Sequence, residues 1–150
     1  MSVVVTQDKF NPWSVLSDYE SMQKRNINSS FDIGASAVFV GTMRDFNEGI
    51  NVECMTLEHY PQMAIRVLSS ITSETRRRWA LQDLFVIHRV GQIYPGEPIV
   101  LVAAWSSHRK EAFQACRHVM EELKSTAPFW KQEKIVTGEA RWVGKNTVGY

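Results

Sequence analysis

The sequence is poor in cysteine and lacks the short motifs of common metal and catalytic sites. Its two cysteines, Cys54 and Cys116, form neither a CxxC pair nor a metal-ligand spacing. HExxH, P-loop, GxGxxG and Ser-His-Asp signatures are missing as well. We therefore expect no metal site, no cofactor and no disulfide framework, and we interpret both cysteines as buried free thiols in a reducing compartment.

An excess of one charge and long apolar runs are also missing. Lys and Arg number 17 against 16 Asp and Glu, for a formal charge of +1, which gives no reason to expect nucleic-acid binding. No apolar run reaches membrane-spanning length, and the start MSVVVTQDKF lacks the charged and apolar regions of a signal peptide. The sequence predicts a soluble cytoplasmic protein, in which any anion site is a local cluster.

The first half of the chain alternates strand and helix patterns. The 150 residues, 44% of them hydrophobic, suit one domain with a sizeable core. Alternation at period two predicts strands at 3–6, 35–40 and 52–60, the last two antiparallel to each other. Pro12 and Pro61 stand at the starts of predicted helices, 12–24 and 61–78. A polar stretch with Asn47 and Gly49 predicts a hairpin or loop between the strands.

The second half continues this mixture. We predict a strand at 84–90, a turn at 91–96 and a central strand at 99–105, which is apolar throughout. Ser106 and Ser107 offer an N-cap for a helix at 109–125. The apolar stripe predicted for this helix comprises Ala112, Phe113, Cys116, Val119, Met120 and Leu123. A segment 129–135 and a strand-like 141–143 follow, so the fold class is α+β, an antiparallel sheet with helices packed on it.

Basic residues stand at both ends of the 109–125 helix. At its start, His108 and Arg109 accompany free backbone N–H groups and the positive end of the helix dipole, which together favour an anion such as phosphate. An ordinary capped helix with an exposed arginine would show the same residues. Taken alone, this cluster favours that simpler interpretation.

At the other end, Lys124 and Lys131 enclose the segment APFW. Such a stiff apolar corner can desolvate a lysine and lower its pKa, which suits the lysine to proton transfer or covalent chemistry. Two solvated lysines are the simpler interpretation. Arg44, just past a strand end, is a third candidate, although a surface arginine is the default.

Three histidines are interpreted as structural. His59 and His88 lie within strand patterns and suit packing positions, and His118 lies off the apolar stripe of its helix, at the surface.

Five segments, in this order and spacing, resemble one family. They are GASAVFVGTMRDFNEG, LEHYPQMA, VIHRVGQIYPGE, SSHRKEAFQACRHVMEELKSTAPFWKQE and GEARWV. Together they are similar to the large, catalytic subunit of molybdopterin synthase, over roughly residues 33–143.

The resemblance implies an α/β hammerhead fold and a homodimer. Each protomer would bind one small ubiquitin-like sulfur carrier, giving a heterotetramer, and the carrier's C-terminal Gly-Gly thiocarboxylate would enter a pocket of the large subunit. The enzyme would be a sulfurtransferase of molybdenum cofactor biosynthesis. It would convert a pterin phosphate, the cyclic pyranopterin monophosphate called precursor Z, into molybdopterin by inserting two sulfurs as a dithiolene. Since the carrier supplies the sulfur, no nucleophilic cysteine is needed.

Residue by residue, the resemblance also implies a pocket. The family's substrate-binding positions fall on Thr42, Met43, Arg44, His108, Arg109, Lys124, Lys131, Gln132, Glu133 and Arg141. We assign the main catalytic role to Lys124 and a supporting one to Lys131, because positioned ammonium groups stabilise the negative charge of acyl intermediates.

The length of the 109–125 helix limits how this pocket is built. Arg109 and Lys124 are separated by about 22 Å at a rise of 1.5 Å per residue, which one small substrate cannot easily span. We therefore predict a composite pocket: His108 and Arg109 of one protomer meet Arg44, Lys124 and Lys131 of the other across a two-fold interface.

Two other functions are kept open. A pure binding module for a phosphorylated small molecule or a ubiquitin-like tail would need no desolvated lysine. A persulfide sulfurtransferase would need a reactive cysteine, so activity retained after changing Cys54 and Cys116 to serine would exclude it.

Overall fold

The computed structural model describes residues 2–26 and 32–144 of the chain. The helices are α1 (Pro12–Asn26), α2 (Pro61–Arg78) and α3 (Arg109–Ser125). The strands are β1 (Ser2–Thr6), β2 (Ala35–Thr42), β3 (Phe46–Asn47), β4 (Ile50–His59), β5 (Leu81–Arg89), β6 (Gly91–Ile93), β7 (Pro98–Ser106), β8 (Phe129–Ile135) and β9 (Ala140–Val143). The predicted α+β class is confirmed.

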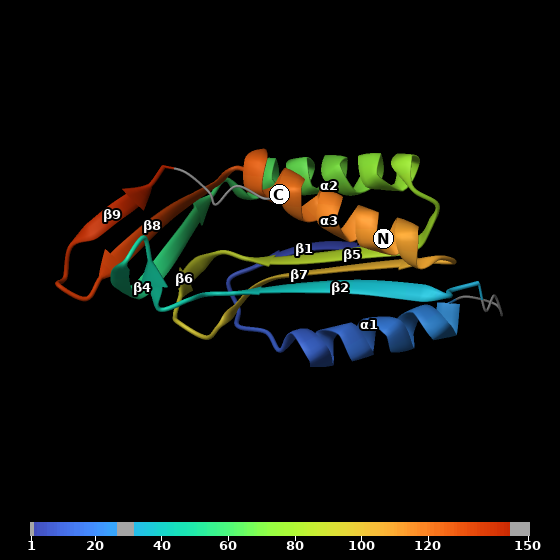
Figure 1. Cartoon of the computed structure of the whole chain (residues 1–150), viewed down its shortest axis with the longest axis horizontal. Helices are drawn as coiled ribbons and strands as arrows, with labels where there is room; N and C mark the ends of the chain where they lie inside the picture. The colour runs from blue at the N-terminus through green and yellow to red at the C-terminus, as the bar shows by residue number, and fades with distance from the viewer. Residues whose placement is uncertain (1, 27–31, 145–150) are drawn as a thin grey trace.

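One sheet has helices on both faces. Its order is β1-β5-β7-β2, with β1 parallel to β5 and the other pairs antiparallel. In Figure 1, α1 lies on one face, and α2 and α3 lie on the other. Strand β7 is central, as its continuous apolar run predicted, because the helices on both faces bury its side chains.

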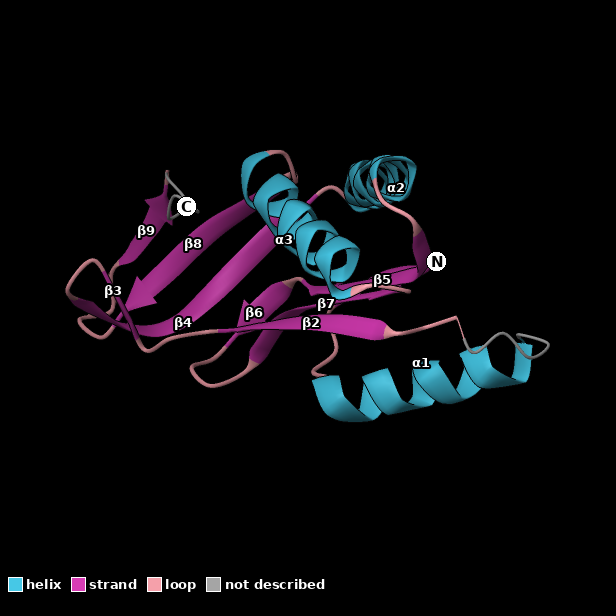
Figure 2. Cartoon of the chain, turned by 45° about the vertical axis from the view of Figure 1, so that its right-hand side comes forward, coloured by secondary structure: helices cyan, strands magenta, loops and turns pink. Residues whose placement is uncertain are grey.

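A second sheet extends from one end of the first (Figure 2). Its order is β3-β4-β8-β9, and β6 also pairs with β4. The prediction that β4 pairs with the preceding long strand is wrong, since β2 pairs with β7 and β4 pairs with β8. The predicted turn at 91–96 also contains the short strand β6. Both differences arise from pairing between residues distant in the chain, which period-two patterns do not encode.

Buried side chains gather in three clusters. One lies between the first sheet and the helices α2 and α3, and includes Leu68, Val102 and Val119. Another lies under α1, around Leu101 and Trp105. The third belongs to the second sheet and includes Met43, Met55 and Ile93.

The start of α3 differs from the prediction in its cap. The N-cap residue is His108, with no side-chain capping bond. Ser106 lies two residues before it, and its Oγ donates to the Ala80 carbonyl oxygen at 2.9 Å and accepts from the His108 amide at 3.4 Å. Ser107 Oγ accepts from Gln82 Nε2 at 2.7 Å. Phe113, predicted in the apolar stripe, is 66% exposed; it stands beyond the edge of that stripe.

The β3–β4 hairpin confirms the turn predicted around Asn47 and Gly49. Asn47 pairs with Ile50, so Glu48 and Gly49 form a two-residue loop. Both have positive φ, 52° and 77°, as a type I′ turn requires. This turn holds Asn47 at the end of β3, in the second sheet.

No helix within 2–26 and 32–144 combines the length and apolar character of a membrane span. Among the same residues, His, Cys, Asp and Glu form no group of three that could hold a metal ion.

Candidate functional site

Two neighbouring cavities lie where the C-terminal end of α3 meets the second sheet. The larger, about 400 Å³, is lined mainly by apolar side chains such as Phe39, Leu57 and Phe129. The smaller, about 240 Å³, is more polar. They share a wall that contains Lys124 and Lys131, so both ammonium-bearing side chains stand between an apolar and a polar compartment.

The polar cavity collects many of the predicted pocket residues. Its lining includes Thr42, Met43, Arg44, Lys124, Lys131 and Glu133. They come from three places: the end of β2 and the turn after it, the last turn of α3, and β8. The register of β2 with β7 shifts between Gly41 and Thr42, just before the turn that carries Arg44.

Lys124 occupies a position that disfavours its charged form. Its pKa is held below the ordinary value by burial of the ammonium group, and the positive charges of Lys131 and Arg44 lower it further. The side chain as a whole is still exposed, so a ligand can reach it. The sequence predicted that the apolar APFW corner lowers the pKa of a lysine, and the pKa of Lys124 is lowered by burial.

A buried carboxylate holds Lys131. Glu133 is only 3% exposed, and its Oε1 lies 3.0 Å from Lys131 Nζ. Arg141 donates from Nη2 to Glu133 Oε2 at 2.9 Å, and Asn47 Nδ2 donates to Oε1 at 2.9 Å. These donors hold the pKa of Glu133 below its ordinary value although burial opposes this. Glu133 therefore fixes Lys131 in place and ties β8 to β9 and to the hairpin.

Arg141 lies behind the cavity. It also donates from Nη2 to the Asn47 carbonyl oxygen at 3.2 Å, and its Nη1 lies 3.5 Å from Glu48 Oε2. Arg141, predicted to bind the substrate, lines neither cavity, and its contacts are with Glu133 and the hairpin.

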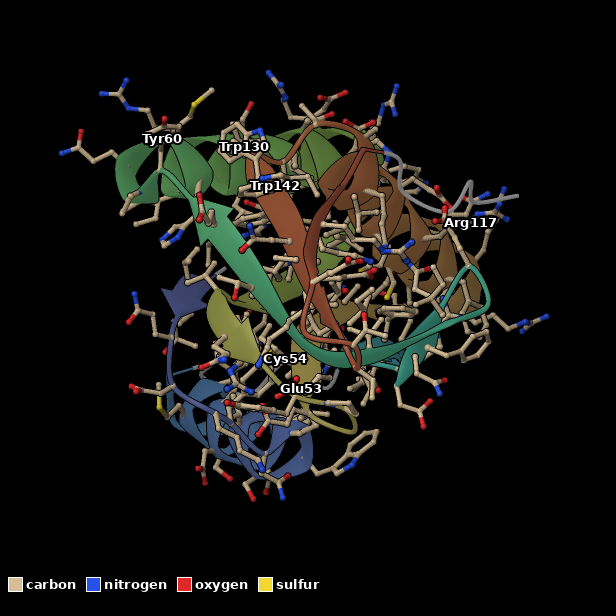
Figure 3. All side chains as sticks on the ribbon, turned by 90° about the vertical axis from the view of Figure 1, so that its left-hand side faces the viewer. Glu53, Cys54, Tyr60, Arg117, Trp130 and Trp142 are labelled. Carbon is tan, nitrogen blue, oxygen red and sulfur yellow. The ribbon has the colours of Figure 1, made fainter. Side chains whose placement is uncertain are left out.

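Gln132 belongs to the opposite face of β8. Alternation along the strand places it with Trp130, and its register partner is Trp142. Figure 3 shows Trp130 and Trp142 close to Tyr60, and these aromatics line a shallow cleft of about 470 Å³. The structure therefore separates Gln132 from Lys131 and Glu133. Of the two aromatic residues in the APFW corner, Phe129 lies beside the lysines and Trp130 lines the cleft on the other face.

His108 and Arg109 stand at the other end of α3. The helix is continuous from Arg109 to Ser125, so the predicted separation from Lys124 is retained. Neither residue lines either cavity. Within one described chain, the two basic clusters do not meet.

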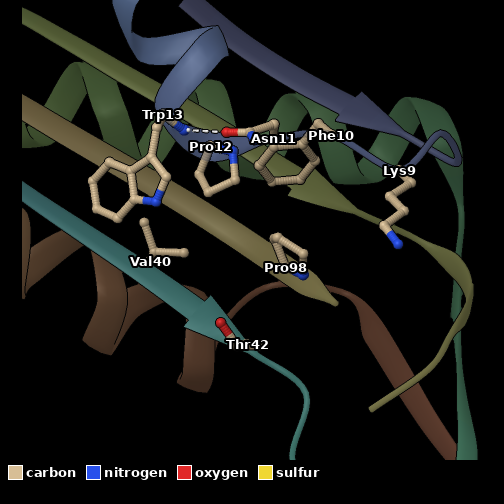
Figure 4. Close-up of a pocket in the computed structure, with 8 residues that line it drawn as sticks. All are labelled: Lys9, Phe10, Asn11, Pro12, Trp13, Val40, Thr42 and Pro98. Atoms are coloured by element: carbon tan, nitrogen blue, oxygen red, sulfur yellow. Dashed lines mark hydrogen bonds between the residues drawn. The ribbon is translucent and has the colours of Figure 1, made fainter. Parts of the chain in front are cut away.

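A third cavity, of about 630 Å³, lies beside the start of α1 (Figure 4). Its walls include Trp13, Val40 and Pro98. Lys9 also lines it, with its Nζ 3.2 Å from Glu97 Oε1. The charge of Lys9 is balanced by the Glu97 carboxylate. The polar cavity instead gathers Arg44, Lys124 and Lys131, so it is the better anion site.

Both cysteines are buried free thiols, as expected. Burial raises the pKa of the Cys116 thiol to about 11. A thiol in this state is a poor nucleophile, which disfavours a persulfide mechanism at Cys116.

Two residues of the site were not selected from the sequence. Asn47 was interpreted only as a turn residue, yet it binds Glu133. His88, interpreted as a packing histidine, stacks on Phe129 with ring centroids 4.2 Å apart and also lines the apolar cavity. Both positions depend on contacts between segments far apart in the chain, Asn47 of β3 with Glu133 and His88 of β5 with Phe129, so no local sequence signal could have found them.

Comparison with known proteins agrees with this geometry. Residues 7–126 match the family model described as MoaE protein. A molybdopterin synthase catalytic subunit of Pseudomonas aeruginosa is 45% identical over 143 residues, which cover 95% of this chain and 90% of that protein. One of Ralstonia nicotianae is 54% identical over 111 residues, which cover 74% of this chain and 62% of that longer protein.

Solved structures agree as well. The molybdopterin biosynthesis MoaE protein from Burkholderia ambifaria superposes with a TM-score of 0.74 at 41% identity, and the match covers 95% of this chain and 88% of that one. The hammerhead-type fold implied by the resemblance is confirmed by this likeness. The chain belongs to the MoaE family, the catalytic subunits of the enzyme molybdopterin synthase.

Proposed function

We propose that this chain is the catalytic subunit of a molybdopterin synthase and forms the dithiolene of molybdopterin in molybdenum cofactor biosynthesis. The observation that carries the proposal is the position of Lys124 and Lys131 in the wall shared by an apolar and a polar cavity. Two substrates of different character, a peptide tail and a pterin phosphate, can approach the same ammonium groups from opposite sides.

The two cavities suit the two substrates. The apolar cavity would take the C-terminal Gly-Gly tail of a small ubiquitin-like sulfur carrier, which has no side chains to accommodate. The polar cavity would take the cyclic pyranopterin monophosphate, because Arg44 and the two lysines offer cationic donors to its phosphate. The thiocarboxylate at the end of the tail then reaches the pterin at the lysines.

Atoms and electrons balance in each sulfur transfer without an external oxidant. The thiocarboxylate sulfur forms a bond to a side-chain carbon of the pterin and displaces the oxygen held by that carbon. Water then cleaves the acyl–sulfur bond, which leaves a carboxylate on the carrier and a thiolate on the pterin. Lys124 would stabilise the negative charge that develops on the acyl oxygen and supply the proton taken by the departing oxygen, and Lys131 would support it. Two carriers are consumed for each product.

The catalytic unit would be a homodimer, a heterotetramer once two carriers are bound. The uninterrupted α3 keeps Arg109 far from Lys124 of its own chain. We assign His108 and Arg109 to the phosphate site of the partner protomer, where a helix N-terminus adds its own attraction for an anion.

Subunit complementation tests this composite pocket. Arg109→Ala and Lys124→Ala homodimers should each be nearly inactive. After mixing and subunit exchange, about half of the dimers are mixed and each carries one intact site, so about a quarter of the wild-type activity should return. Mixtures that stay as inactive as the separate variants place Arg109 and Lys124 in the same pocket of one chain. An active Arg109→Ala homodimer places Arg109 outside the pocket.

The whole proposal is tested by product formation. The purified chain, a thiocarboxylated Gly-Gly carrier and precursor Z should together yield molybdopterin, detected as its fluorescent oxidation product. The matched control is the same carrier with an ordinary carboxylate, which should yield none. Binding of both substrates without product would support the binding module instead.

We further propose that residues 1–150 act as one domain and that the protein works in the cytoplasm. The unpaired, buried Cys54 and Cys116 suit a reducing compartment.

A further inference from the structure

His88 contributes a ring with polar nitrogens to a cavity that is lined mainly by apolar side chains. Strand β5 carries it into the lining of the larger cavity, which also contains Lys124 and Lys131. The side chain is 8% exposed, and its ring is held parallel to that of Phe129, at 16°. Burial and stacking therefore hold the ring in the wall of the cavity.

The hydrogen bond of the ring fixes which nitrogen accepts. His88 Nδ1 lies 2.8 Å from the carbonyl oxygen of Arg89, and a carbonyl oxygen only accepts, so Nδ1 carries a hydrogen. Burial lowers the pKa of His88 to about 4, opposed by the Arg89 bond and aided by the positive charge of Lys124 and by His59. The ring is thus neutral near pH 7, and Nε2 keeps a lone pair. Nε2 has no hydrogen-bond partner among the described residues.

A peptide entering this cavity brings backbone N–H groups that lose water. An amide left without an acceptor in an apolar site costs binding free energy. The lysines are donors and cannot satisfy an N–H, whereas a neutral imidazole nitrogen can.

We propose that His88 Nε2 accepts a hydrogen bond from a backbone amide of the carrier's Gly-Gly tail and so recognises the tail. This inference rests on the proposed function, because it takes the carrier tail as the occupant of the apolar cavity. It assigns His88 a role in binding the tail, while Lys124 and Lys131 act on the thiocarboxylate.

The test uses the complete chain and the carboxylate form of the carrier, with binding measured by calorimetry. Two further carriers are made by semisynthesis, each with one of the two terminal glycine amides replaced by an ester, which removes one N–H. His88→Phe retains the stacking on Phe129 and removes the acceptor. It should weaken binding of the amide carrier about tenfold, the effect of one buried hydrogen bond.

If His88 Nε2 binds one of these amides, the losses of affinity caused by the ester and by His88→Phe should not add. One ester carrier should bind wild-type protein about tenfold more weakly, and with that carrier His88→Phe should add less than about a twofold loss. His88→Gln, whose amide oxygen can accept, should recover most of the affinity. If both ester carriers bind the wild type as tightly as the amide carrier does, the proposal is overturned even should His88→Phe fail to fold.

Turnover separates this inference from the proposed function. His88→Phe should raise KM for the thiocarboxylated carrier and leave kcat and the KM for precursor Z within about twofold. His59→Phe, a change of the neighbouring histidine outside the apolar cavity, serves as the matched control and should leave all three unchanged. A fully active His88→Phe variant refutes the inference alone, whereas wild-type protein that makes no product refutes the proposed function.

Discussion

Lys124→Ala is expected to lower kcat for dithiolene formation by about a thousandfold, because it removes a positioned cation and proton donor from the reacting atoms. The lowered pKa of this lysine also suits it to proton transfer near neutral pH. Its side chain is exposed and supports no buried cluster, so the fold and carrier binding should persist. Single-turnover product formation, circular dichroism and carrier calorimetry measure the three quantities.

The matched control for this change is Lys134→Ala. Lys134 lies on β8 near Lys131, but its side chain is exposed and pairs with Glu53 at 3.1 Å. This variant should turn over at the wild-type rate. A kcat for Lys124→Ala within about tenfold of wild type would remove Lys124 from the catalytic role, since general acid–base residues contribute about a hundredfold or more.

Glu133→Ala should be the most destabilising single change at the site. It leaves Lys131 and Arg141 without the carboxylate that both contact, at 3.0 and 2.9 Å. Breaking a buried pair by removing one partner costs about 3 kcal/mol of unfolding free energy. Lys131 and Arg141 are each partly exposed, at 29% and 28%, so the loss should lie at or below that figure. Denaturant unfolding measures it.

Glu53→Ala is the control, because Glu53 forms an ion pair of the same kind at the surface. Its loss should cost less than about 1 kcal/mol. The pKa of Glu133 is lowered in the folded state, so its contribution is present above the ordinary carboxyl value and is lost as pH falls through the folded-state value. The stability difference between wild type and Glu133→Ala should therefore shrink in acid. A difference that stays constant from pH 7 to pH 3 would contradict this role.

Local features of the sequence predicted much of the fold. Pro12 and Pro61 begin helices as expected, and the apolar run of β7 lies at the centre of its sheet. The partner of β4 could not be predicted, because β8 begins seventy residues after β4 ends and two antiparallel partners satisfy the same alternation.

The candidate site shows the same limit. Residues 131–133 were treated as one contiguous group, yet a strand sends Gln132 to the face opposite Lys131 and Glu133. Had 129–135 been recognised as a strand, the alternation alone would have separated them. The alternation could not have assigned His88 to the site. The sequence pattern of β5 is the same whether the His88 ring packs in a core or faces a cavity.

The corner between α3 and β8 has one more consequence. Pro128 is buried in it, and the Phe129 amide donates to the Ala127 carbonyl oxygen at 2.8 Å. Lys124 and Lys131 are thus joined by a short, rigid connection, and their backbones are set relative to each other when the chain folds. The conformational entropy of these two backbone segments is lost when the chain folds and not when the substrate binds. The lysine pair is therefore preorganised, and the free energy of tail and pterin binding remains available for aligning sulfur with carbon.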